Sequence, residues 1–281
     1  MDVFSTTKAM RAWSRACRVN GESVAFVPTM GSLHDGHISL VRSAKERADR
    51  VVVSIYVNPS QFAPGEDLES YPRDSEGDRA KLLAAGCDAV FEPVSLYESG
   101  HETWVRVERL EQPMCGKSRP IFFRGVATVV CKLFHAVEPD IAVFGKKDFQ
   151  QWRVIERMVR DLDFGIEIVG LPIVREADGL AMSSRNARLG PAERVVALSL
   201  SRALHQAHQA VQRGIFEASV LIDGIQSTLS EAGARIDYVE IVDAVTLEPV
   251  GVVDRTCVVA LAAHVGAVRL IDNLEISPEP Q

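Results

Sequence analysis

Residues 23–57 read SVAFVPTMGSLHDGHISLVRSAKERADRVVVSIYV, and this stretch decides the fold class. The apolar run at 23–30 predicts a strand that stops near Pro28, and apolar residues at helical spacing predict a helix over 38–48. The run RVVVSIYV at 50–57 is apolar almost throughout, which is typical of a parallel strand covered on both faces. A strand, a helix and a second strand in this order predict one unit of a parallel α/β sheet.

The same alternation continues to about residue 172. The expected elements are a helix at about 74–86, a strand at 88–93, a helix near 125–137, a strand at 140–145, a helix at about 148–160 and a strand at 164–172. Repeated alternation of this kind predicts a doubly wound, Rossmann-like parallel sheet.

The pattern changes after about residue 176. A long amphipathic stretch from Pro191 to Gly214 predicts a helix with proline at its first position, and a second helix is expected at about 216–232. Three alternating segments between 235 and 276 then predict a small antiparallel sheet. We therefore expect a Rossmann-like domain at 1–176 and a smaller α+β domain at 177–281.

Composition excludes several classes of protein. Lys and Arg total 31 and Asp and Glu total 38, so the formal net charge of the 281 residues is −7, which argues against a nucleic-acid partner. No apolar run approaches the roughly 20 residues that span a bilayer, and the N-terminus lacks the apolar core of a signal peptide. The five cysteines are scattered without a C-x-x-C pair, so neither disulfides nor a zinc knuckle is expected. These features predict a soluble cytoplasmic protein with no membrane partner.

The most informative motif is PTMGSLHDGH at 28–37, where the first strand gives way to a helix. Ligands bind at this end of the strands in open α/β folds, and the N–H groups of a helix N-terminus attract anions. The motif is not a P-loop, because His37 stands where a lysine is required. From the residues alone, His34 and His37 could contact a phosphate, form part of an incomplete zinc site, or only cap the turn. Phosphate is favoured because an imidazole can donate to developing phosphoryl charge.

A second phosphate-binding candidate is READGLAMSSRN at 175–186. The hydroxyl groups of Ser183 and Ser184 and the guanidinium of Arg185 are donors suited to phosphate oxygens. The alternative interpretation is a polar loop that ends at a helix start. His-x-Gly-His followed by such a segment resembles the nucleotidylyl-transferase superfamily, which includes the class I aminoacyl-tRNA synthetases.

Longer motifs narrow the resemblance to one family. They are PTMGSLHDGH (28–37), VNPSQFAPGEDLESYPRD (57–74), CGKSRPIFFRGVATVVCKLF (115–134), FGKKDFQQW (144–152) and DGLAMSSRN (178–186). Together they resemble the pantothenate synthetases, or pantoate–β-alanine ligases, over the whole chain. The resemblance implies an ATP-dependent condensation of (R)-pantoate with β-alanine through a pantoyl adenylate, with release of AMP and pyrophosphate. It also implies Mg²⁺ accompanying ATP as the substrate, no tightly bound organic cofactor, no dedicated metal ligands in the chain, and a homodimer.

The same resemblance assigns residues. It implies catalytic roles for His34, His37 and Lys147: both histidines contact phosphates, His37 is the proton donor, and Lys147 stabilises the α-phosphate and the leaving pyrophosphate. Gln61 and Gln151 are implied in binding the pantoate or β-alanine substrate. The residues implied in binding ATP are Met30, Gly31, Ser32, Leu33, His34, Asp35, Gly36, His37, Gly145, Lys146, Lys147, Asp148, Val174, Met182, Ser183, Ser184 and Arg185.

Weaker candidates complete the implied pantoate site. Phe62, Val129 and Val130 could line a pocket for the geminal methyl groups, although core packing would explain the valines equally well. Asn58 and Arg124 are further candidates.

One departure and two alternatives remain. The family usually has Gly-Glu-Lys-Asp where this chain has Gly-Lys-Lys-Asp, and we expect the side chain of Lys146 to point outward. The first alternative function is another nucleotidylyl transferase that keeps the nucleotide in its product. The second is an RNA-binding module derived from a synthetase, which the charge of −7 disfavours.

Overall fold

The computed structural model describes residues 1–278, and its backbone contacts divide the chain into two compact units. The first unit comprises 1–111, 119–146 and 151–173. The second comprises 112–118, 147–150 and the chain from Val174 onward, so it includes two short segments that precede the C-terminal region in sequence. No helix within residues 1–278 is long and apolar enough to cross a membrane.

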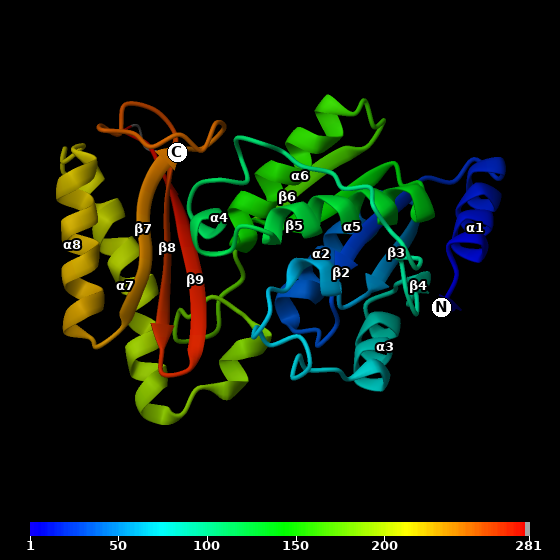
Figure 1. The fold of residues 1–281 in the computed structure, drawn as a ribbon, viewed down its shortest axis with the longest axis horizontal. Helices are drawn as coiled ribbons and strands as arrows, with labels where there is room; N and C mark the ends of the chain where they lie inside the picture. Colours follow the sequence, from blue (N-terminus) through cyan, green and yellow to red (C-terminus); the bar gives the residue numbers. More distant parts are fainter. Residues whose placement is uncertain (279–281) are drawn as a thin grey trace. The chain divides into compact units, whose positions relative to one another are not determined.

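The first unit contains a six-stranded parallel sheet (Figure 1). Its strands are β1 (Asp2–Phe4), β2 (Val24–Thr29), β3 (Arg50–Ile55), β4 (Ala89–Phe91), β5 (Ile141–Gly145) and β6 (Glu167–Leu171), in the order β1-β4-β3-β2-β5-β6. The doubly wound parallel sheet predicted from the sequence is confirmed. The edge strand β1 was not predicted.

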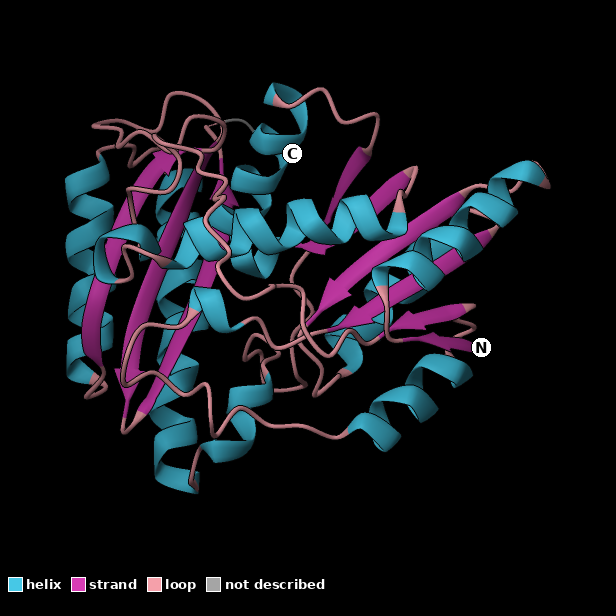
Figure 2. Ribbon diagram, turned by 45° about the vertical axis from the view of Figure 1, so that its right-hand side comes forward, coloured by secondary structure: helices cyan, strands magenta, loops and turns pink. Residues whose placement is uncertain are grey.

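Helices connect these strands (Figure 2). The helices up to residue 161 are α1 (Thr7–Val19), α2 (Asp35–Lys45), α3 (Ser75–Ala84), α4 (Cys115–Ser118), α5 (Phe122–Val137) and α6 (Phe149–Asp161), with 3₁₀ turns at η1 (Pro59–Gln61) and η2 (Lys146–Asp148). Alternate residues of β2 explain its continuous apolar run. Val27 joins a buried cluster with Val41 of α2, whereas the ring of Phe26 packs edge-on against Phe134 of α5, with ring centroids 6.3 Å apart.

Helix α1 has no counterpart among the predicted elements. Its N-cap is Thr6, whose hydroxyl accepts a hydrogen bond from the backbone N–H of Ala9 at 3.3 Å. The buried residues of α1 are Met10, Ser14 and Cys17, a narrow stripe with a serine at its centre. Met10, Trp13 and Cys17 nevertheless recur at helical spacing, so the sequence carries the apolar periodicity of a helix here.

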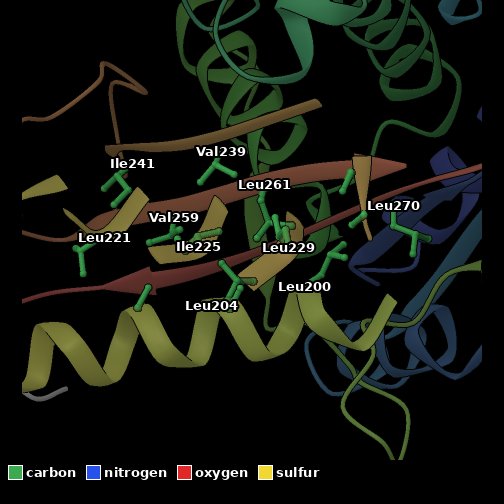
Figure 3. Close-up of a cluster of buried hydrophobic side chains, with 14 of the residues drawn as sticks. Leu200, Leu204, Leu221, Ile225, Leu229, Val239, Ile241, Val259, Leu261 and Leu270 are labelled. Atoms are coloured by element: carbon green, nitrogen blue, oxygen red, sulfur yellow. The ribbon is translucent and has the colours of Figure 1, made fainter. Parts of the chain in front are cut away.

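The second unit contains the predicted antiparallel sheet. Its strands β7 (Arg235–Asp243), β8 (Cys257–Val265) and β9 (Val268–Ile276) pair in sequence order. Its other elements are η3 (Ser184–Arg188), α7 (Pro191–Gln212) and α8 (Ala218–Glu231). Figure 3 shows Leu204 of α7, Leu229 of α8 and Leu261 of β8 within one buried apolar cluster, which holds the two helices against the sheet.

Candidate active site

The carboxyl ends of β2 and β3 lie side by side in the first unit. Thr29, the last residue of β2, is paired with Ile55, the last residue of β3. The turn that begins at Met30 and the segment 56–61 therefore leave the sheet at the same edge. Open α/β folds bind their ligands at this edge.

The turn at residues 30–37 requires a glycine at its start. Gly31 has φ +82°, a conformation that side chains other than hydrogen rarely adopt. A Cβ atom on Gly31 would also lie 3.0 Å from Cγ2 of Ile55 and 3.1 Å from Oδ2 of Asp78. The backbone of the turn is consequently packed directly against β3 and α3.

Two charged residues of α3 fix the turn from behind. Asp78 is only 1% exposed, and its two carboxylate oxygens accept the backbone N–H groups of Ser32 and Leu33, each at 2.7 Å. The ammonium of Lys81 donates to the carbonyl oxygen of Leu33, also at 2.7 Å. Sequence reasoning missed both residues. Alternating charged and apolar residues in SEGDRAKLLA are equally consistent with a solvent-facing helix.

The rings of the two histidines of the turn lie close together and are tilted by 34° with respect to each other. His34 is the N-cap of α2, and the ring centroids of His34 and His37 are 4.0 Å apart. The backbone N–H of His34 donates to Nδ1 of His37 at 3.3 Å. A ring nitrogen that accepts a hydrogen bond carries no proton, so the neutral His37 ring is protonated on Nε2. His37 can therefore act as a donor through the opposite edge of its ring.

Gln61 is joined to this turn. Its side chain is 6% exposed, and Nε2 lies 3.2 Å from the sulfur of Met30. Its Oε1 accepts a hydrogen bond from Nδ2 of Asn58 at 3.0 Å. A Cβ atom on Gly125 would lie 2.5 Å from the carbonyl oxygen of Ser60, so α5 packs backbone to backbone against this segment. The structure thus brings together Met30, Gln61 and the weaker candidate Asn58.

The remaining weaker candidates lie on or near α5. Phe62 is buried with its ring edge-on to Tyr71, and Val129 and Val130 are buried side chains of α5. The guanidinium of Arg124 lies over the ring of Trp104, with 4.5 Å between the guanidinium carbon and the ring centroid.

Backbone and side-chain hydrogen bonds hold the serine-rich segment of the second unit, residues 174–186, in shape. The backbone N–H of Met182 donates to the carbonyl oxygen of Val174 at 3.0 Å, so two of the implied ATP-binding residues are adjacent. Ser183 is the N-cap of η3, and its hydroxyl accepts the backbone N–H of Arg185 at 3.3 Å. Asn186 donates from Nδ2 to the carbonyl oxygen of Ala181 at 3.0 Å.

A charged network supports the same segment. Arg194 donates to Glu176 at 2.6 Å and to Asp178 at 2.8 Å, and Asn186 donates to Glu176 at 2.6 Å. Burial would raise the pKa of Glu176, but the hydrogen bonds from Arg194 and Asn186 outweigh it and hold that pKa below its usual value. The hydrogen bond from Arg194 likewise lowers the pKa of Asp178.

Comparison with known proteins decides the family. The family model described as "Pantoate-beta-alanine ligase" matches residues 2–275. The chain belongs to this family. Both alternatives left open by the sequence, another nucleotidylyl transferase and an RNA-binding module, are therefore set aside.

Individual relatives agree over nearly the full length. A rice protein (Oryza sativa subsp. japonica), "Pantoate--beta-alanine ligase", is 54% identical, with 98% of this chain and 96% of the relative covered. "Pantothenate synthetase" of Anaeromyxobacter dehalogenans is also 54% identical, with 97% of each chain covered. The crystal structure of pantothenate synthetase from Thermus thermophilus superposes with a TM-score of 0.93 at 44% identity, covering 99% of this chain and 100% of that one.

A further solved structure contains ligands. Pantoate-beta-alanine ligase from Francisella tularensis, complexed with "Beta-gamma ATP and Beta-alanine", superposes with a TM-score of 0.82 at 31% identity. The match covers 99% of this chain and 100% of that one.

The segment GKKDFQQ departs from the family pattern at Lys146, and the structure shows where that side chain goes. Its ammonium lies 4.9 Å from the centroid of the Trp152 ring and the residue is half-buried, so the expected outward orientation is wrong. The side chain is attracted to the electron-rich face of the indole. Lys147 and Asp148 belong to the second unit, where the carbonyl oxygen of Lys147 accepts a hydrogen bond from Asn273 at 2.9 Å.

The adjacent glutamines of this segment differ in their surroundings. Gln150 is 5% exposed, and both ends of its amide serve backbone groups: Oε1 accepts the N–H of Cys115 at 3.1 Å and Nε2 donates to the carbonyl oxygen of Pro113 at 2.7 Å. Gln151 is only half-buried. Of the two, Gln151 therefore remains the candidate for contact with a substrate.

Within residues 1–278, no three His, Cys, Asp or Glu side chains are grouped so that they could hold a metal ion.

Proposed function

We propose that this chain joins the carboxylate of (R)-pantoate to the amine of β-alanine, using ATP to form a pantoyl adenylate and releasing pyrophosphate and then AMP. The observation that carries the proposal beyond family membership is the link between the histidine turn and Gln61. Nε2 of Gln61 lies 3.2 Å from the sulfur of Met30, so a group beside Gln61 is also beside the turn that carries His34 and His37. This is the juxtaposition that attack of a carboxylate on a nucleotide phosphate requires.

In the first half-reaction the turn at residues 30–37 would bind the triphosphate. The protonated Nε2 of His37 can donate a hydrogen bond to phosphate oxygens on which negative charge develops. The ring of His34, with its centroid 4.0 Å from that of His37, packs against this ring. Gly31, Asp35 and Gly36 would approach the nucleotide through their backbone. Ser32 and Leu33, whose backbone N–H groups donate to Asp78, would hold the shape of the turn beside it. No side chain needs to act as a covalent nucleophile in this scheme.

Lys147 would stabilise the α-phosphate and the leaving pyrophosphate, and Asp148 a ribose hydroxyl. Gly145 and Lys146 would complete that side of the nucleotide site. The segment of the second unit, Val174 with Met182, Ser183, Ser184 and Arg185, would add hydroxyl and guanidinium donors for phosphate oxygens. In functional terms, residues 1–176 would supply the histidine turn and Gln61, and 177–281 the serine-rich segment.

Gln61 and Gln151 would bind pantoate. A glutamine amide can donate to a carboxylate and accept from a hydroxyl, and pantoate carries both groups. Enclosure of the adenylate would keep water from hydrolysing it before β-alanine attacks.

Three finer points belong to the same proposal. ATP would enter as its Mg²⁺ complex, with triphosphate and water oxygens as the main ligands of the ion. The enzyme would be a homodimer, as the family resemblance implies, which a molar mass from light scattering would test. A cytoplasmic location is supported by the five cysteines, all of them free thiols.

The deciding experiment is isotope exchange. With pantoate and Mg²⁺ but without β-alanine, the enzyme should exchange labelled pyrophosphate into ATP, because adenylate formation precedes amide formation. Addition of β-alanine should then release AMP. Exchange that requires β-alanine, or ADP as the product, would contradict the adenylate and indicate an acyl phosphate instead.

A further inference from the structure

A tyrosine outside all the motifs described above reaches the candidate pantoate site. Tyr97 lies in the loop after β4, and its hydroxyl donates to Oδ1 of Asn58 at 3.0 Å. The hydroxyl of Ser60 lies 2.9 Å from that of Tyr97 and donates to the same Oδ1 at 3.0 Å. Asn58 is 1% exposed, so bulk water cannot replace these hydrogen-bond partners of its amide.

Backbone groups at both ends decide which way the Asn58 amide points: the N–H of Ser60 donates to Oδ1 at 3.4 Å, and the carbonyl oxygen of Gly125 accepts from Nδ2. The hydroxyl groups of Tyr97 and Ser60 add two hydrogen bonds to Oδ1 in that orientation. Because Oδ1 faces Tyr97 and Ser60, Nδ2 faces the other way and donates to Oε1 of Gln61 at 3.0 Å and to the carbonyl oxygen of Gly125 at 3.1 Å. The reverse orientation would set an amide NH₂ against the backbone N–H of Ser60 and Oδ1 against the carbonyl oxygen of Gly125, so both ends of the amide would meet a group of the wrong kind.

The orientation of Asn58 in turn decides that of Gln61. With Oε1 accepting from Asn58, the NH₂ group of Gln61 is the end directed to the Met30 sulfur and the histidine turn. Gln61 therefore presents a donor, which suits a carboxylate or hydroxyl oxygen of a substrate.

The ring of Tyr97 is itself held in place. His101 lies edge-on to it with ring centroids 4.9 Å apart, and the ammonium of Lys132 lies 5.4 Å from its centroid. Burial raises the pKa of Tyr97 to about 12, so the hydroxyl keeps its proton and remains a donor at neutral pH.

We propose that Tyr97 is a positioning residue for the pantoate site: by holding Asn58 in place it helps to keep the Gln61 amide with its NH₂ group toward the substrate. The inference rests on the proposed function, in which Gln61 binds pantoate. In this proposal Tyr97 acts through the amides of Asn58 and Gln61 and not by contact with a substrate.

The test compares Tyr97→Phe with Tyr56→Phe. The first removes the hydroxyl and leaves the ring. The second is a matched control, because the Tyr56 hydroxyl accepts the backbone N–H of Leu96 at 3.3 Å and so supports the same loop without contacting Asn58. Tyr97→Phe should raise the KM for pantoate about 3- to 10-fold, as loss of one buried hydrogen bond does. The KM for ATP should change by less than about twofold in both variants, and so should the KM for pantoate in Tyr56→Phe.

A double-mutant cycle separates positioning from loop support. In a Gln61→Ala background, Tyr97→Phe should change the KM for pantoate by less than about twofold, because the residue it positions is gone. Any of three results would overturn the inference. Tyr97→Phe could leave the KM for pantoate unchanged, it could raise that KM as much in the Gln61→Ala background as in wild type, or Tyr56→Phe could raise it as much as Tyr97→Phe does.

A second variant keeps the inference testable if Tyr97→Phe lowers the thermal stability of the enzyme too far for kinetic measurement. Asn58→Asp keeps the acceptor for Tyr97 and removes the donor to Gln61, so it should raise the KM for pantoate at least as much. A wild-type value there would also overturn the inference. Failure of the proposed function looks different: wild type would show no pantoate-dependent pyrophosphate exchange, or Gln61→Ala would leave the KM for pantoate unchanged.

Discussion

The turn at residues 30–37 and the segment at 174–186 are proposed to serve the same triphosphate, yet they are held in different ways. The turn is fixed by Asp78, a 1% exposed carboxylate that accepts two backbone N–H groups. The segment is fixed by Arg194 between Glu176 and Asp178, whose side chains are 26%, 32% and 38% exposed.

This difference predicts how each region responds to change. A buried backbone N–H that loses its acceptor costs about 1–3 kcal/mol, whereas an exposed ion pair contributes about 0.2–1 kcal/mol and weakens with salt. The turn should be rigid and intolerant of substitution. The segment should adapt more readily to substitution.

The largest effect is expected from His37→Ala. The rate of adenylate formation should fall by about 10²–10³, because a preorganised donor to developing phosphate charge is lost. Pyrophosphate exchange with pantoate measures this step, and circular dichroism checks that the variant is folded.

His34→Ala should also slow exchange, with a larger share of its loss in ATP affinity. Ser184→Ala, in the adaptable segment, serves as the comparison and should lose less rate than His37→Ala. A folded His37→Ala enzyme with wild-type exchange would remove His37 from the mechanism and reverse the ranking of the two regions.

The second effect concerns Asp78, the residue that makes the turn rigid. Asp78→Ala should lower the free energy of unfolding by about 2–3 kcal/mol and raise the KM for ATP, because two backbone N–H groups of the turn lose their acceptor. Asp74→Ala is the matched control on the same helix: Asp74 caps α3 by accepting the N–H of Gly77 at 3.0 Å, so its loss should cost about 1 kcal/mol. Asp74→Ala should leave the KM for ATP unchanged. If both variants raised the KM for ATP equally, α3 would affect the nucleotide site only through the stability of the helix.

The fold was largely predictable because its signals are local. The apolar runs of β2 and β3 are continuous since both faces of these strands are covered, and sequence reasoning placed both strands correctly. Helix α1 was missed although Met10, Trp13 and Cys17 recur at helical spacing, so in this case the signal was present in the sequence.

The candidate site was predictable only where it lies in long motifs. The turn and Gln61 come from quoted motifs, and the structure connects them through Met30. Asp78 and Tyr97 were not predicted, because their partners lie more than 35 residues away along the chain. Nothing in a short window of sequence marks a side chain whose role is to hold a distant backbone or amide.

A smaller effect is expected at the segment of the second unit. Arg194→Ala should raise the KM for ATP only a few-fold and should lower the free energy of unfolding by about 1 kcal/mol or less, because its ion pairs are partly exposed. Both differences from wild type should shrink between about 50 and 500 mM salt. Arg255→Ala is the control for loss of an arginine ion pair outside the segment, since Arg255 pairs with Asp243 and Asp254 in the same unit. If Arg194→Ala lowered the free energy of unfolding as much as Asp78→Ala does, the two regions would be equally rigid.

The smallest effect is the pH dependence that Glu176 of the segment contributes. Because the pKa of Glu176 is lowered in the folded protein, ionised Glu176 stabilises the fold fully above its unfolded value of about 4.5. That contribution is lost as the pH falls from there through the folded pKa. The thermal midpoint of Glu176→Gln should therefore lie below that of wild type at pH 7, and the difference should begin to shrink near pH 4.5 and vanish only below the folded pKa. Glu248→Gln, at an exposed site in the turn after β7, should follow wild type at every pH. A Glu176→Gln difference that persists unchanged in acid would mean that packing of the side chain, rather than its charge, holds the segment.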